Sequence, residues 1–326
     1  MPGRRRLWSE MLPYDAVAEP SLLADLAGRG VELVVAVTPP TVREAPRLVD
    51  ACRAAGVGIA LWPMLDDRDG RWPSAANAEL FARFCRELVA GLRAARSMPD
   101  EIAIDLEPPI DRVRALLDGR ARALVQASGP RGGRALAGLV AELRAEVRVS
   151  AAVTPVVMLP SALASRGWER ALGTPVDLGL DSVNAMAYTS LFEGYSRGWL
   201  RRADAVALLS AVAGACARRW GARAAISLGV VGAGALGDEN AYRNADELAE
   251  DVALAEAAGI DEIALFALDG IVARPPREAW LDALGGAGER AAAPPTTTWR
   301  TMTALAAGTA TGVVVGAFGR MRRRPR

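Results

Sequence analysis

The sequence predicts one closed (β/α)8 barrel, the TIM barrel architecture, over residues 1–285. Short apolar strand-like runs alternate with longer stretches that have helical spacing, which predicts a parallel sheet. Eight such units follow one another in one chain, which favours closure into a barrel. Several of the runs also end in polar or aromatic residues, as barrel strands do at an active site. A doubly wound open sheet is the main alternative.

The expected strands and helices follow in strict alternation. Strands are predicted at residues 7–12, 32–38, 58–65, 101–107, 147–154, 182–188, 224–231 and 262–268. Helices are predicted at residues 21–29, 41–55, 74–96, 111–146, 161–172, 202–220, 244–258 and 276–284. The fourth of these helices is interrupted by "SGPRGGR" at residues 128–134, which favours a turn over an anion-binding loop.

Beyond residue 285 the composition changes. Residues 286–298 are rich in Gly, Ala, Pro and Thr, which predicts a disordered linker. Residues 299–326 form an apolar tail with an arginine-rich end, and its charge-free part, 302–319, is long enough for a transmembrane helix detached from the barrel. The glycines at 308, 312 and 316 have the spacing of helix-packing faces in membranes. The alternative is an apolar tail that does not span a membrane.

The two ends of the chain determine which cellular location we expect for the protein. No signal peptide is visible after the basic start, because no apolar stretch follows it. The arginine-rich end should remain in the cytoplasm, which would place the barrel outside. We therefore expect either membrane association through residues 302–319 or a cytoplasmic barrel. The oligomeric state cannot be predicted from the sequence.

Composition excludes several kinds of chemistry. The chain has no histidine, and all 39 of its basic residues are arginine. This removes Ser-His-Asp triads, histidine-ligated zinc and lysine Schiff bases. Catalysis without a cofactor must then use carboxylates, tyrosine, hydroxyls and arginine, and neither a metal nor a cofactor is expected. The formal charge of +1 predicts no nucleic-acid partner. The three cysteines are expected to be buried thiols.

A pair of acids closes the fourth predicted strand, "DEIAIDLEPP". Alternation along a strand places Ala103, Asp105 and Glu107 on one face, which is the lumen of a barrel. Active sites of such barrels lie at the carboxyl ends of the strands. Two neighbouring carboxylates raise the pKa of one of them, which suits a general acid of glycoside hydrolysis. The alternative is a strand end held by ion pairs with arginines.

These residues resemble the fourth-strand signature of family-18 glycoside hydrolases, the chitinases and their relatives, Asp-Gly-x-Asp-x-Asp-x-Glu. Asp100, Asp105 and Glu107 match this signature. Glu101 stands where glycine is usual, and Ala103 replaces the middle aspartate. Without that aspartate, Asp105 has no deeper neighbour with which to share a proton.

Two further strands carry weaker matches in the right order. "VNAMAYTS" resembles the family's sixth-strand Met-x-Tyr-Asp through Met186 and Tyr188, with Thr189 in place of the aspartate. "ALFALDGI" resembles the eighth strand, where Phe266 takes the place of the tryptophan that floors the sugar subsite. Asn184 shares a strand face with Met186 and Tyr188.

The resemblance implies hydrolysis of glycans that contain N-acetylglucosamine, by a retaining route in which the substrate's acetamido group is the nucleophile. It implies that Glu107 protonates the glycosidic oxygen, that Asp105 holds the acetamido N–H, and that Tyr188 binds the acetamido oxygen. The expected partner is thus a carbohydrate. One alternative is an inactive barrel that binds a glycan or a protein. Another is a two-carboxylate glycosidase that pairs Glu107 with Glu10 or Glu193.

Two loops complete the candidate site. The segment "LWPMLDDRDGRWPS" at residues 61–74 contains Trp62, Asp66 and Trp72 and is expected to stack against and bind sugar, or else to be an ordinary amphipathic loop. The segment "GAGALG" at residues 232–237 fits the glycine pattern of a dinucleotide site, but no helix follows it directly. A flexible loop at the mouth of the barrel is therefore the favoured interpretation over phosphate binding.

Overall fold

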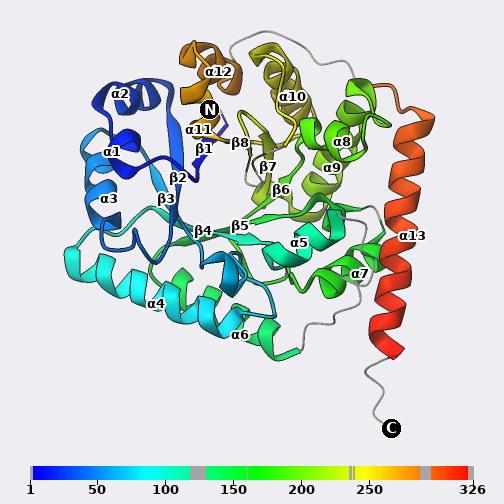
Figure 1. Cartoon of the computed structure of the whole chain (residues 1–326), viewed down its shortest axis with the longest axis horizontal. Helices are drawn as coiled ribbons and strands as arrows, with labels where there is room; N and C mark the ends of the chain where they lie inside the picture. Colours follow the sequence, from blue (N-terminus) through cyan, green and yellow to red (C-terminus); the bar gives the residue numbers. More distant parts are fainter. Residues whose placement is uncertain are drawn as a thin grey trace.

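The fold is a closed barrel of eight parallel strands in sequence order, as predicted (Figure 1). The computed structural model describes residues 3–117, 130–159, 161–234, 237, 239–286 and 295–321. The strands are β1 Arg5–Ser9, β2 Val31–Val37, β3 Ile59–Pro63, β4 Glu101–Leu106, β5 Arg148–Val153, β6 Ser182–Met186, β7 Ala224–Gly229 and β8 Glu262–Phe266. Each of the eight expected strands is present, and the open-sheet alternative is wrong.

Helices surround the barrel, and most lie where the helical spacing predicted them. They are α2 Pro20–Arg29, α3 Ala45–Ala54, α4 Ala78–Ala95, α5 Ile110–Leu117, α6 Pro130–Arg144, α7 Ala162–Leu172, α9 Arg202–Trp220, α10 Ala245–Ala257 and α12 Arg277–Leu284. Three short helices follow strand ends and were not predicted: α1 Tyr14–Val17, α8 Thr189–Tyr195 and α11 Leu268–Ala273. They are too short to show a helical period in the sequence.

The turn expected at residues 128–134 is only partly within the described chain. Residues 130–134 belong to the first turn of α6, so the expected turn is wrong there. Proline fits this position because its missing N–H has no partner in a first helical turn. Gly132 is needed for a close approach, since a Cβ atom there would lie 2.0 Å from the carbonyl oxygen of Ala75.

Strand β4 alternates between the outer core and the lumen. Ile102, Ile104 and Leu106 belong to the large cluster beneath the helices, whereas Ala103 belongs to the cluster inside the barrel. The face that carries Ala103 also carries Asp105 toward the carboxyl end and Glu101 toward the amino end. The predicted alternation therefore agrees with the fold and turns Asp105 toward the mouth of the barrel.

A buried ion network occupies the amino end of the lumen and accounts for Glu101. The Arg6 side chain is fully buried, and it donates hydrogen bonds to Glu101 (2.6 Å) and to Glu262 (3.0 Å). Arg4 also donates to Glu101, at 2.8 Å. Buried charges need partners of the opposite sign. Together, Arg6 and Arg4 lower the pKa of Glu101 to about 2 against the effect of burial. A glycine at 101 would leave Arg6 without this partner.

The tail forms helix α13, Trp299–Met321, which packs on the barrel (Figure 1). It runs beside α7, where the indole N–H of Trp168 donates to the carbonyl oxygen of Gly308 at 2.9 Å. A Cβ on Gly167 would lie 1.8 Å from the carbonyl oxygen of Gly312, so the two backbones touch. The expectation of a detached helix is therefore wrong. The glycine spacing serves helix packing within the chain.

The ends of the tail fall partly outside the described residues. Of the predicted linker, residues 287–294 are outside them, as are 322–326 of the arginine-rich end. The start of α13 is held by Thr298, whose hydroxyl donates to the Asp204 carboxylate on α9. In the part of the chain that the structure describes, none of the helices has both the length and the apolar character needed to cross a membrane. This does not support the membrane span expected for residues 302–319.

Candidate active site

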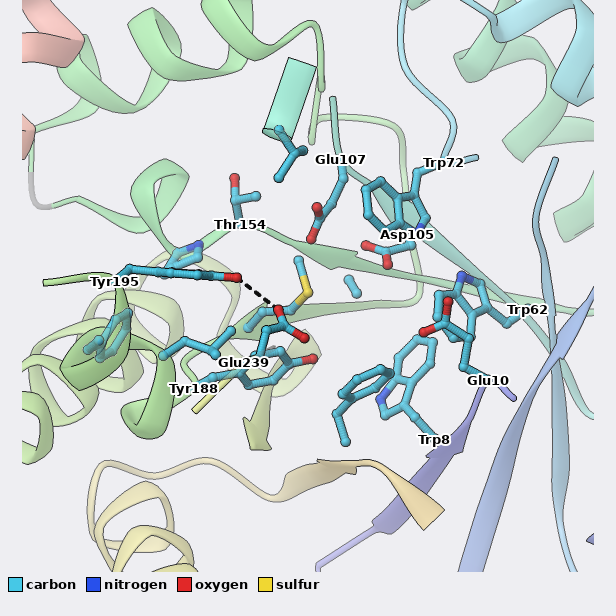
Figure 2. A pocket seen from close by; sticks show the side chains of 17 residues that line it. Trp8, Glu10, Trp62, Trp72, Asp105, Glu107, Thr154, Tyr188, Tyr195 and Glu239 are labelled. Atoms are coloured by element: carbon cyan, nitrogen blue, oxygen red, sulfur yellow. Dashed lines mark hydrogen bonds between the residues drawn. The ribbon is translucent and has the colours of Figure 1, made fainter. Parts of the chain in front are cut away.

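A cavity of about 240 Å³ lies at the carboxyl ends of the strands, where barrel enzymes have their active sites. Its lining is aromatic and acidic (Figure 2). The acids are Glu10, Asp105, Glu107 and Glu239, and the rings are Trp8, Trp62, Trp72, Tyr188, Phe192, Tyr195 and Phe266. This volume is near the small end of ligand pockets, which span about 300–1,000 Å³, so it suits a single small unit of a ligand.

Asp105 and Glu107 face this cavity from the end of β4, as their position in the sequence predicted (Figure 2). Among the described residues, no arginine forms an ion pair with either carboxylate, so the alternative of a strand end held by ion pairs finds no support there. Burial raises the pKa of Glu107 to about 8, and the charges of Glu239 and Glu10 add to this effect. Burial and the Glu107 and Glu10 charges also raise the pKa of Asp105 well above its usual range. Glu107 therefore holds its proton at neutral pH, and Asp105 takes up a proton more readily than an ordinary aspartate.

Glu10 enters the site from the end of β1. Strand β1 ends at Ser9, which places Glu10 directly at the mouth. Its Oε1 accepts a hydrogen bond from Arg71 at 2.9 Å, and its backbone N–H donates to Asp269 at 3.1 Å. Burial nevertheless raises the pKa of Glu10 to about 7, against the effect of Arg71. The sequence offered Glu10 only as an alternative partner of Glu107, because the predicted strand ran on to residue 12.

Glu239 was not predicted. It lies in the segment after β7, and its Oε1 accepts a hydrogen bond from the Tyr195 hydroxyl at 2.9 Å (Figure 2). The segment "GAGALG" begins this loop, although Ala235 and Leu236 lie outside the described residues. Irregular loops carry no hydrophobic period, so nothing in the sequence marked this acid as a cavity residue.

Tyr188 and Phe266 form one wall of the cavity. Their rings are stacked with centroids 6.0 Å apart and planes 17° apart. Gly229 on β7 makes room for Tyr188, because a Cβ there would lie 3.2 Å from its ring. Burial raises the pKa of Tyr188 well above its usual range, and the neighbouring charges of Asp105 and Glu107 add to this effect. The hydroxyl therefore stays protonated and can donate a hydrogen bond.

Asn184 lies deeper in the barrel than the residues that line the cavity, and its side chain packs behind them. Its side-chain amide donates to the Ser227 hydroxyl at 2.9 Å, and the Trp8 indole donates to the same oxygen at 3.2 Å. Asn184 is thus buried behind the wall, whereas Met186, two residues further along the strand, lines the cavity.

Three tryptophans complete the aromatic wall. The rings of Trp8 and Trp62 meet edge to face, with centroids 5.0 Å apart. Trp62 comes from the end of β3, and Trp72 reaches the cavity from the loop after β3. Sugar rings have apolar faces that pack on such surfaces. The indole nitrogens of Trp62 and Trp72 are buried and have no hydrogen-bond partner within the described chain, which leaves two donors for a ligand.

The other sequence-predicted residues lie outside the cavity. Asp66 is on the surface, where it pairs with Arg68 at 3.2 Å. Thr189 donates a hydrogen bond to the buried Asp251 at 2.5 Å and does not line the cavity. Glu193, considered as a second carboxylate, pairs with Arg243 at 3.6 Å and is likewise absent from the lining.

The fold of the chain is similar to that of glycoside hydrolases of known structure. The glycoside hydrolase domain of PgaB (BpsB) from Bordetella bronchiseptica aligns with a TM-score of 0.53 and 13% identity, over 87% of this chain and 99% of that one. A GH5-4 broad-specificity endoglucanase from Clostridium longisporum aligns with a TM-score of 0.50 and 12% identity, over 88% and 95% of the two chains. At such identities the likeness shows the shared fold.

A more remote alignment concerns the family that the sequence resembles. A family GH18 chitinase from Cycas revoluta aligns with a TM-score of 0.49 and 14% identity, over 87% of this chain and 99% of that one. No protein-family model matches the chain, and no curated protein matches it. The alignments with PgaB (BpsB) and with the endoglucanase show a barrel with a fold like that of these glycoside hydrolases.

Proposed function

We propose that the protein is a glycoside hydrolase acting on glycans that contain N-acetylglucosamine, by substrate-assisted retaining hydrolysis. The observation that carries the proposal is the arrangement of Asp105, Glu107 and Tyr188 around one aromatic cavity at the carboxyl ends of the strands. This site needs neither the histidine nor the lysine that the chain lacks. The glycoside-hydrolase-like fold supports the same class of reaction.

Glu107 acts first as an acid and then as a base. With a pKa of about 8 it is protonated at neutral pH, so it can give its proton to the glycosidic oxygen as the bond to the anomeric carbon breaks. The carbonyl oxygen of the substrate's acetamido group forms the new bond to that carbon. The Glu107 carboxylate then takes a proton from the water that opens the cyclic intermediate, and the configuration is retained.

Asp105 and Tyr188 hold the acetamido group during these steps. The Oδ1 atom of Asp105 is buried and has no hydrogen-bond partner among the described residues, so it can accept from the acetamido N–H. Positive charge on the cyclic intermediate favours the ionised form of Asp105. Tyr188 donates to the acetamido oxygen through a hydroxyl that stays protonated.

Two other functions retain specific support. An inactive barrel that binds a glycan is favoured by Ala103 and by Thr189, whose hydroxyl is engaged with Asp251. A two-carboxylate glycosidase is favoured by Glu10, because it lines the same cavity as Glu107. In that mechanism Glu10 would attack the anomeric carbon directly, which requires a carboxyl separation of about 5 Å.

The experiment that tests the proposal is incubation of the full chain with fluorogenic chitobioside and chitotrioside at several pH values. Hydrolysis that a thiazoline mimic of the cyclised intermediate inhibits supports the substrate-assisted route, since such a mimic resembles the transition state. Glycan binding without hydrolysis would instead support the inactive barrel. Hydrolysis of substrates without an acetamido group would support the two-carboxylate route.

A further inference from the structure

We propose that one exposed face of helix α13 docks on the surface of an anionic lipid bilayer, and that the arginines at the end of the chain contact the lipid headgroups. In this arrangement the helix lies along the bilayer surface and stays packed on the barrel. The inference goes beyond the proposed hydrolysis and does not depend on it.

The exposed face runs along α13 on the side away from the barrel. The helix lies at the edge of the molecule, and α7 contacts its inner side at the glycines (Figure 1). The residues on the other side recur three and four apart, as one side of a helix requires. We call this side the outer face; it consists of Trp299, Met302, Thr303, Ala306, Ala307, Ala310, Val314 and Ala317. The barrel therefore covers only one side of α13.

The outer face is apolar along its length. None of the residues from 301 to 319 is charged. Apart from the Trp299 indole, Thr303 has the only polar side chain of this face, and its hydroxyl donates to the carbonyl oxygen of Trp299 at 2.9 Å. A helix that is apolar on all sides is normally buried on all sides. The exposure of the outer face therefore indicates that a second apolar environment covers it.

Two exposed tryptophans meet at the start of α13. Trp299 and Met302 are each 63% exposed, and Trp199, from the loop before α9, is 40% exposed. The rings of Trp199 and Trp299 meet edge to face, with centroids 5.9 Å apart. Exposed apolar patches of this kind mark interaction sites. An indole is apolar and also carries one N–H donor, so tryptophan prefers the boundary between lipid and water.

The charge at the end of the chain favours an anionic partner. Residues 290–326 contain no aspartate or glutamate. The residues that follow the outer face include an arginine cluster, which consists of Arg320, Arg322, Arg323, Arg324 and Arg326. The whole chain has a formal charge of only +1, so this positive charge is local. Basic residues next to an apolar helix face are attracted by lipids with negative headgroups.

A second copy of the chain suits the outer face less well than a bilayer does. Between Met302 and Ala317, Val314 is the only exposed side chain larger than threonine, so a second helix would bury little apolar surface. A second copy also carries the same arginine cluster and cannot neutralise it. A bilayer supplies both an apolar layer for the outer face and negative charge for the arginines.

The test uses the purified full-length chain and preformed vesicles. Co-sedimentation is measured with vesicles of phosphatidylcholine alone and with vesicles of phosphatidylcholine and phosphatidylglycerol, at low and at high salt. Ala310→Glu and Val314→Glu each place a charge on the outer face, and Ala90→Glu, at an exposed position of α4, is the matched control. A further variant replaces every residue of the arginine cluster by glutamine. Thermal unfolding without lipid checks that each variant is folded.

The wild type should bind the anionic vesicles at least about tenfold more tightly than the neutral ones, because each arginine near an anionic surface adds to the attraction. High salt should reduce this preference. The arginine-cluster variant should lose most of the preference. Ala310→Glu and Val314→Glu should weaken binding about tenfold or more, since docking would bury their charge among the acyl chains. Ala90→Glu should bind as the wild type does.

Equal binding to the two kinds of vesicle would overturn the inference, and so would binding that Ala310→Glu and Val314→Glu leave unchanged. A dimer that these two variants dissociate, with no binding to vesicles, would assign the outer face to a second copy instead. Protein that resists an alkaline carbonate wash would be inserted in the bilayer, which would also contradict docking at the surface. Hydrolysis of chitotrioside without lipid measures the proposed function separately, so each proposal can fail without the other.

Discussion

The Tyr195 hydroxyl donates a hydrogen bond to Glu239 Oε1 at 2.9 Å and thereby joins α8 to the loop after β7 at the edge of the cavity. This contact holds a carboxylate within electrostatic reach of Glu107. The charge of Glu239 is one of the causes of the raised pKa of Glu107, after burial. A residue outside the predicted signature therefore helps to set the proton affinity of the proposed acid.

Glu239→Gln should shift the alkaline limb of the pH profile of kcat/KM to lower pH. In the wild type this limb should lie near pH 8, where Glu107 loses its proton. Removing the neighbouring negative charge lowers the pKa of Glu107 toward its usual range, so the acid form is lost earlier. Glu193→Gln, outside the cavity, should leave the limb in place. A limb that does not move in Glu239→Gln would show that burial alone sets this pKa.

Glu107→Gln should reduce hydrolysis by roughly 10²–10⁴-fold while glycan binding persists. The amide keeps the shape of the side chain but cannot give a proton. Rates with fluorogenic chitobioside, and calorimetric binding of an intact oligomer, measure the two effects separately. Retention of the wild-type rate in a pure preparation would exclude Glu107 as the acid.

The stability of the protein should fall as the pH rises from about 5 to 8. The folded protein holds protons on Glu107 and Glu10 up to pKa values of about 8 and 7, above the ordinary value of 4.5. Over this interval the folded state binds more protons than the unfolded state, so raising the pH favours unfolding. Denaturant titrations at pH 5 and pH 8 measure the difference.

In the same titrations Glu107→Gln should flatten this pH dependence, because one of the two acids is gone. The exposed Glu87→Gln on α4 is the control for the loss of a charge. A dependence as steep in Glu107→Gln as in the wild type would mean that Glu107 ionises in the folded protein much as it does in the unfolded chain.

Ala103→Asp tests whether the missing carboxylate matters. Ala103 is fully buried in the lumen cluster, so a new acid there should cost about 1–3 kcal/mol of stability if it finds no partner. In an active enzyme the new acid can share a proton with Asp105 and should change the pH profile of kcat/KM. Ala103→Asn is the control, since it adds similar bulk without a titrating group. Identical profiles for the two variants would show that position 103 has no part in proton transfer.

Gly312→Ala should loosen α13 from α7. A Cβ there would lie 2.7 Å from both the Ala164 carbonyl oxygen and the Trp168 ring, and such overpacking costs about 1–3 kcal/mol. Gly308→Ala is the matched control: its Cβ would meet only Leu159, at 3.4 Å, and alanine favours a helix over glycine by up to about 1 kcal/mol. Thermal unfolding and limited proteolysis around α13 measure the effect. Equal stability of the two variants would argue against the glycine contact.

The position of Asp105 and Glu107 at the mouth of the barrel could be predicted from the sequence, because it depends on the alternation of side chains along a single strand. Alternation along β4 determines that Asp105 faces the lumen, and the parallel barrel determines that strand ends meet at one mouth. Tyr188 and Phe266 were expected from the family resemblance, and the structure places both in the lining of the cavity. Asp66 was misplaced because a loop has no such period, and its side chain turned to Arg68 on the surface.

The sequence by itself determined the barrel, the mouth at which its site lies and the residue types available for chemistry, because these follow from periodicity and composition. Only the tertiary structure decided that Glu10 and Glu239 join the cavity and that α13 packs on α7. These features depend on side chains distant in sequence meeting in space, such as Arg71 with Glu10 and Trp168 with Gly308. The raised pKa values likewise arise from burial among neighbouring charges, which exists only once the chain has folded.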